Sequence, residues 1–141
     1  MDTSTRSFEE IMLARLEDLL ARRYPGLKLD VPTSGSYVFA PRPDFVISNP
    51  STGALLICQV KSGLPARYIP LTTPGYVRDL RDWFLTDRGV DGGVVLISTG
   101  PIPELVKKGL EQYGIPFFEV DSPEEATKRL EPQLGKLQQA A

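Results

Sequence analysis

Three residues in the first half of the chain have the side chains and the spacing for phosphodiester chemistry. Asp44 follows a proline at the start of one apolar run, and Gln59 and Lys61 close the next run as Gln-x-Lys. A carboxylate and an amide oxygen are hard ligands of the kind that Mg²⁺ accepts. A nearby ammonium can stabilise the charge that develops on a phosphate. One feature is irregular, because a neutral Gln59 stands where a carboxylate would be expected.

Two adjacent strands would bring these residues together. Two short apolar runs predict strands over 44–48 and 55–61, and the connection between them contains Pro and Gly, as expected for a hairpin. The two-residue period of a strand puts Gln59 and Lys61 on the same face. Since both faces of the second strand are otherwise apolar, it is predicted to be a central strand with a polar end.

The first helix offers a second carboxylate. Ser7-x-x-Glu10 is a capping box that predicts a helix running to about Arg23. Its apolar stripe consists of Phe8, Met12, Leu16, Leu19 and Leu20. At about 100° per residue Glu9 falls inside this stripe, so it reaches the site if the helix packs over the face of Gln59 and Lys61. The helix dipole also favours an acid in the first turn, so a purely structural interpretation of Glu9 stays open.

The second half of the chain alternates helices and strands. Before the strand pair, in the first half, short strands are predicted over 27–31 and 37–39. In the second half, Thr73-Pro74 is typical of a helix start. Helices are then expected over 74–88 and 103–113 and after Ser122, with strands over 94–98 and 117–120. The order predicts one α/β domain over residues 1–141, a mixed β-sheet of four or five strands flanked by helices on both faces.

Composition excludes several classes of protein. The chain has no histidine and one cysteine, so Ser-His-Asp catalysis, His-ligated metal sites and internal disulfides are excluded. Cys58 lies in an apolar strand and is expected to be buried and inert. The net charge is −2, unlike that of a strongly basic nucleic-acid binder. No apolar run approaches a membrane span and no signal pattern opens the chain, so a cytoplasmic location without membrane contact is expected.

The same residues resemble the PD-(D/E)xK nuclease superfamily. The signature reads Pro43-Asp44 and then Gln59-Val60-Lys61, and the segments 94–100 and 113–121 are similar to the second half of Mrr-type restriction endonuclease domains. The middle acid is often Gln in that branch. The resemblance implies a restriction endonuclease-like core, Asp44 and Gln59 as ligands of Mg²⁺ or Mn²⁺, Lys61 as the catalytic lysine, and Glu9 as the first-helix acid.

The leading functional hypothesis is a metal-dependent nuclease that hydrolyses DNA, with RNA not excluded. Arg67 and Tyr68 follow the predicted strand over 55–61, and Arg42 precedes the Pro-Asp pair. These three residues are therefore candidate nucleic-acid contacts. A chain this small has little room for a targeting domain, so a homodimer or a partner protein is plausible.

Two alternatives stay open. The chain is a catalytically inactive module of the same fold, for nucleic-acid binding or assembly, if the missing acid abolishes metal binding. It is an unrelated α/β protein if Asp44 only caps a turn, Gln59 and Lys61 only form a solvated strand end, and these residues do not meet.

Overall fold

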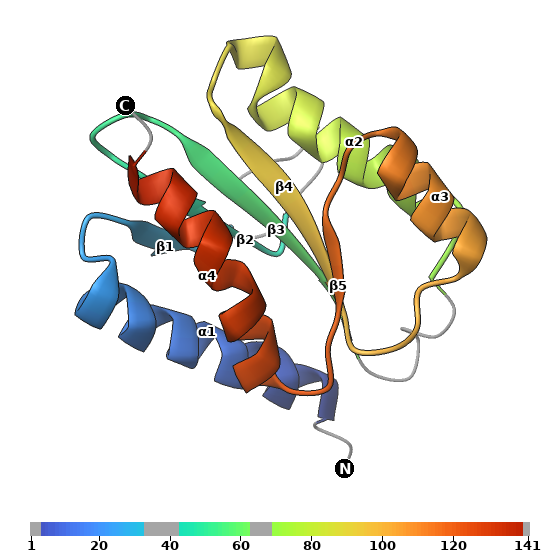
Figure 1. The fold of residues 1–141 in the computed structure, drawn as a ribbon, viewed down its shortest axis with the longest axis horizontal. Helices are drawn as coiled ribbons and strands as arrows, with labels where there is room; N and C mark the ends of the chain where they lie inside the picture. Colours follow the sequence, from blue (N-terminus) through green and yellow to red (C-terminus); the bar gives the residue numbers. More distant parts are fainter. Residues whose placement is uncertain (1–3, 33–42, 63–68, 140–141) are drawn as a thin grey trace.

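A five-stranded mixed β-sheet with helices on both faces organises the chain (Figure 1). The structure is a computed structural model and describes residues 4–32, 43–62 and 69–139. Within these ranges the elements are α1 (Ser4–Arg23), β1 (Lys28–Asp30), β2 (Phe45–Ser48), β3 (Leu55–Lys61), α2 (Thr73–Phe84), the 3₁₀ turn η2 (Thr86–Arg88), β4 (Gly92–Ser98), α3 (Glu104–Gln112), β5 (Phe117–Glu119) and α4 (Pro123–Gln139). The predicted α/β class and mixed sheet are confirmed.

The strands lie in the sheet in the order of the sequence. β1, β2 and β3 form an antiparallel meander, and β4 and β5 continue it parallel to β3. The predicted hairpin joins β2 to β3, where the Asn49 N–H donates to the Ala54 carbonyl at 2.9 Å. Gly53 adopts φ of 80° in this turn, a conformation that favours glycine. β3 is therefore a central strand, as predicted.

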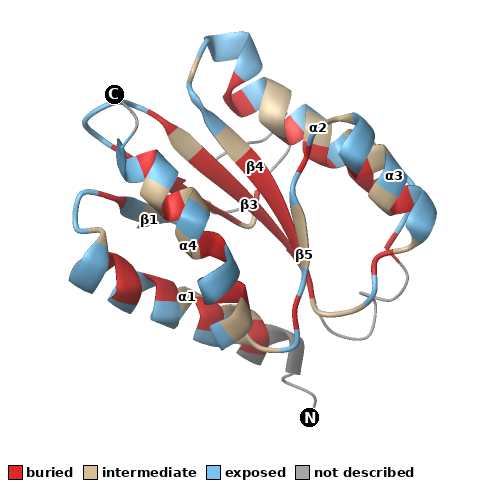
Figure 2. Cartoon of the chain, in the orientation of Figure 1, coloured by how far each residue is buried: buried red, intermediate tan, exposed pale blue. Residues whose placement is uncertain are grey.

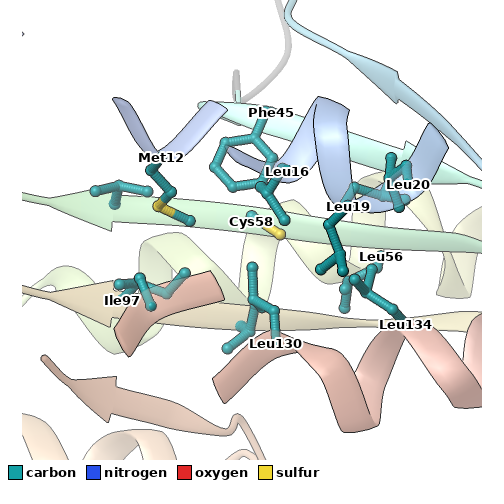
Figure 3. Close-up of a cluster of buried hydrophobic side chains, with 14 of the residues drawn as sticks. Met12, Leu16, Leu19, Leu20, Phe45, Leu56, Cys58, Ile97, Leu130 and Leu134 are labelled. Carbon is teal, nitrogen blue, oxygen red and sulfur yellow. The ribbon is translucent and has the colours of Figure 1, made fainter. Parts of the chain in front are cut away.

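Each face of the sheet packs against a different pair of helices. α1 and α4 lie together over one face, and α2 and α3 lie over the other (Figure 1). Figure 3 shows the first core, in which Met12 and Leu16 of α1 and Leu130 of α4 surround Cys58 of β3. The apolar stripe predicted for the first helix is buried in this core. Cys58 is a free and buried thiol, as expected.

Alternation along β3 divides its side chains between the two cores. Leu56, Cys58 and Val60 belong to the core under α1 and α4, whereas Ile57 belongs to the core under α2 and α3. The middle of β3 and of β4 is buried, and the helices expose only their outer surfaces (Figure 2). Gln59 shares the face of Ile57, and so the polar end of β3 is directed toward α2.

Three expectations need correction or fall outside the described residues. α1 begins at Ser4, before the predicted cap, since a capping box favours a helix start without preventing residues ahead of it from being helical. The cap residue of α2 is Thr72, one residue before the position predicted. The possible strand over 37–39 lies outside the described residues. No helix in the described ranges is long and apolar enough to cross a membrane.

Candidate functional site

Asp44 is hydrogen-bonded to Gln59 and to Val60 where β2 begins beside the end of β3. Phe45 pairs with Cys58 in the antiparallel ladder, so Asp44 stands next to Gln59 one step further along. The Asp44 N–H donates to the Gln59 Oε1 at 3.1 Å, and the Val60 N–H donates to the Asp44 Oδ2 at 2.6 Å. The Pro-Asp and Gln-x-Lys segments are therefore fixed to each other by both backbone and side chain.

The Asp44–Gln59 bond also fixes the orientation of the Gln59 amide. A backbone N–H can only donate, so the group that faces it must be the amide oxygen and not the NH₂. Gln59 is only 7% exposed. The amide oxygen, which has a second lone pair, is thus held beside Asp44 by packing and by a hydrogen bond.

Glu9 approaches Asp44 from the opposite face of the sheet. Burial and then the charge of Asp44 raise the pKa of the half-buried Glu9 carboxyl. Burial and the same charge also raise the pKa of the Cys58 thiol, which lies in the α1 core. The field of Asp44 thus reaches the α1 side. The first helix packs over the face opposite Gln59 and Lys61, so the expectation that it covers their face is wrong, and Glu9 is linked to Asp44 only through the charge that raises its pKa.

Lys61 ends β3 on the same face as Gln59. The two side chains line one pocket of about 240 Å³ that extends to the start of α2. Among the described residues the Lys61 ammonium makes no ion pair, whereas Lys107 on α3 is paired with Glu104 and Glu119. Lys61 is therefore placed to meet an anion that enters the pocket.

The predicted set is brought together around Asp44, but not on one face. Asp44 contacts Gln59 directly and interacts electrostatically with Glu9, and Lys61 lies beside Gln59. The predicted contacts Arg42, Arg67 and Tyr68 lie outside the described residues.

Two further observations concern metal binding at this end of the sheet. Within the described residues there is no group of three or more His, Cys, Asp or Glu side chains that could hold a metal ion. The Ser62 hydroxyl, which directly follows β3, is buried without a hydrogen-bond partner. A metal site built on these described residues would therefore combine the two carboxylates with other oxygens, such as the Gln59 amide, backbone carbonyls or water.

Sequence reasoning missed the part of the pocket that α2 supplies. Thr72, Thr73 and Tyr76 line the pocket opposite Gln59 and Lys61. A signal was present, since the helix that follows a strand in a parallel crossover begins near the carboxyl end of that strand. The Thr73-Pro74 pattern by itself predicts only a helix start.

Comparisons with known proteins assign no family to this chain. No family model matches the chain, and comparison with curated proteins and with solved structures finds no significant match.

Proposed function

We propose that this chain is a metal-dependent nuclease that hydrolyses phosphodiester bonds in DNA. The observation that supports the proposal is the pair of hydrogen bonds around Asp44, which holds a carboxylate and the Gln59 amide oxygen together at the end of β3. Lys61 stands on the same face as Gln59. This arrangement is the one that the PD-(D/E)xK resemblance requires of its core motif.

The oxygen donors fit a hard divalent cation such as Mg²⁺ or Mn²⁺. Burial and then the charge of Asp44 raise the pKa of Glu9, and a cation held by these two carboxylates would relieve that repulsion. Gln59 would supply the third oxygen. A site with two carboxylates and one amide is expected to hold Mg²⁺ weakly, so Mn²⁺ should support activity better.

The residues would divide the work of hydrolysis. A divalent cation supplies Lewis-acid polarisation of the phosphoryl oxygen and lowers the pKa of bound water. Asp44 and Glu9 would orient that cation, and Gln59 would hold Asp44 in position. Lys61 would stabilise the negative charge that develops on the phosphate.

The alternative is a catalytically inactive nuclease-fold module for nucleic-acid binding or protein assembly. It is favoured by one observation, that the Asp44 Oδ2 and the Gln59 Oε1 each already accept a backbone N–H. Both oxygens would then serve the fold alone. Calorimetry with Mn²⁺ separates the two readings, because an inactive module gives no binding heat even at millimolar metal.

Cleavage of plasmid DNA tests the proposal directly. Wild-type protein is expected to nick or cut DNA with Mg²⁺ or Mn²⁺ and not in EDTA. Lys61→Ala should lower the rate about 10²-fold or more while the thermal unfolding midpoint is retained. Lys128→Ala, an exposed lysine on α4, is the matched control and should cut like wild type. Equal cleavage by Lys61→Ala would remove the role assigned to Lys61.

The same assay addresses substrate and assembly. Duplex DNA, single-stranded DNA and RNA of one sequence can be compared side by side. Gel filtration with and without DNA then tests for a homodimer, which would provide two sites for two strands.

A further inference from the structure

The pocket beside Lys61 has the lining of an anion site. Its volume is about 240 Å³ and it lies between the end of β3 and the start of α2. The described residues that line it are Gln59, Lys61, Pro70, Thr72, Thr73 and Tyr76. None of these is acidic, and every polar side chain among them carries an N–H or O–H donor.

Two of the donors are almost fully buried and have no partner. Gln59 is 7% exposed and Thr73 is 4% exposed. Within the described residues neither the Gln59 Nε2 nor the Thr73 hydroxyl makes a hydrogen bond. Both donor atoms retain some contact with solvent. In the described residues, the Ser62 Oγ is the only side-chain polar atom that is fully buried and has no hydrogen-bond partner. Because buried polar groups are normally paired, these two donors are available to an acceptor that enters the pocket from solvent.

The first turn of α2 adds a favourable field. This helix is 12 residues long, and its amino end carries the positive end of the helix dipole. The Thr73 N–H already donates to the Pro70 carbonyl at 3.0 Å and Pro74 has no N–H, so the helix contributes its field rather than a row of free donors. Its first turn contains no acidic residue, and the Thr72 cap makes no side-chain hydrogen bond to the helix. No carboxylate in the first turn offsets the dipole, so the dipole adds to the positive potential that the Lys61 ammonium creates in the pocket.

We propose that this pocket binds a phosphate group of the nucleic-acid strand, adjacent to the phosphate that is cleaved. The identity of the ligand rests on the proposed nuclease function, whereas the preference for an anion rests on the lining alone. Gln59 connects the two places, because its oxygen accepts from Asp44 and its side chain also lines the pocket. Lys61, which the proposed nuclease also uses at the cleaved phosphate, supplies positive charge to this neighbouring phosphate, and Thr73 supplies a neutral hydrogen bond.

Binding without metal tests this pocket independently of cleavage. The probe is a single-stranded 20-nucleotide DNA with a 3′ fluorophore, measured by anisotropy in EDTA over a range of salt concentrations. Lys61→Ala should weaken binding about tenfold and lower the salt slope by about 0.7, the value for one lost phosphate contact. Thr73→Val should weaken binding roughly fivefold without changing the slope.

Matched substitutions outside the pocket provide the controls. Thr127→Val removes a hydroxyl that is similarly buried, in α4, and Lys128→Ala removes an exposed ammonium from the same helix. Both should bind the probe like wild type. Competition by inorganic phosphate against the wild-type protein gives a reading that needs no variant. It should displace the probe, and a wild-type complex unaffected by millimolar phosphate would count against the pocket.

The outcomes separate this proposal from the nuclease proposal. Unchanged affinity and salt slope in both Lys61→Ala and Thr73→Val would overturn the phosphate pocket, even if wild type cuts DNA. Reduced binding in both variants, with no cleavage by wild type, would keep the pocket and reject the nuclease. Removing the 5′ phosphate from the probe distinguishes a terminal phosphate, whose loss weakens binding, from an internal one, whose binding is unchanged.

Discussion

Substitution of Asp44 separates its structural role from its proposed catalytic one. The Asp44 Oδ2 accepts the Val60 N–H at 2.6 Å, a short bond between an ionised acceptor and the backbone of β3. Asp44→Ala removes this acceptor and leaves the N–H of a largely buried strand without its partner. Asp44→Asn keeps an oxygen at nearly the same place and removes only the charge.

The expected loss of stability follows from this bond. A hydrogen bond to a charged group contributes about 1.5–3 kcal/mol, and a neutral one about 1 kcal/mol. Both substitutions also relieve the repulsion with Glu9, which acts in the opposite direction. We therefore expect Asp44→Ala to lower the free energy of unfolding by about 2 kcal/mol at pH 7, and Asp44→Asn by about 1 kcal/mol. For a chain of this length 1 kcal/mol corresponds to roughly 3–4 °C in the unfolding midpoint.

Urea unfolding followed by circular dichroism measures the two values in metal-free buffer. Plasmid cleavage with Mn²⁺ is measured on the same samples, and both variants should be inactive because the carboxylate is lost. An Asp44→Ala variant as stable as wild type would refute the hydrogen-bond argument. An Asp44→Asn variant that cuts DNA at the wild-type rate would refute the metal role of Asp44 while leaving the structural argument intact.

Three further changes test other parts of the molecule. Burial and the charge of Asp44 raise the pKa of Glu9, so the ionisation of Glu9 lowers the stability of the fold as the pH rises above the ordinary glutamate pKa. Glu9→Gln should therefore raise the thermal unfolding midpoint at pH 7 without metal, and this gain should disappear below about pH 4. In thermal unfolding, Gln59→Glu should lower the unfolding midpoint in EDTA. Adding Mn²⁺ should raise the midpoint of this variant by more than it raises that of wild type. Gly92→Ala should lose about 3 kcal/mol in urea unfolding, since Gly92 has φ of 145° and a Cβ would lie 1.8 Å from the Leu55 carbonyl oxygen.

Local patterns in the sequence were sufficient for the elements and for the strand pair of the site. The turn over 49–53 and the alternation along β3 specify an antiparallel pair, and the observed register places Asp44 beside Gln59. The stripe of the first helix specifies which of its residues are buried. These signals act over a few residues and depend on periodicity, which is why they were readable.

Periodicity does not tell which face of the sheet a helix covers, and here the prediction for Glu9 was incomplete. β3, β4 and β5 are parallel and consecutive, and right-handed crossovers put α2 and α3 on one face of such a sheet. The other face is then left for α1 and α4. The handedness rule thus explains why Glu9 reaches Asp44 from the side opposite Lys61. The pocket on α2 depends on the same topology.

Gln59 is better understood as a link between two sites than as a lost acid. The Asp44 N–H needs an acceptor, and a glutamate oxygen would serve as well as the amide. A glutamate would, however, add a third negative charge next to Asp44, whose field already contributes to raising the pKa of Glu9. It would also remove the NH₂ group from a pocket whose polar side chains all carry donors. In the proposed nuclease a third carboxylate should strengthen metal binding and weaken phosphate binding, so the neutral amide allows both ligands to be held side by side.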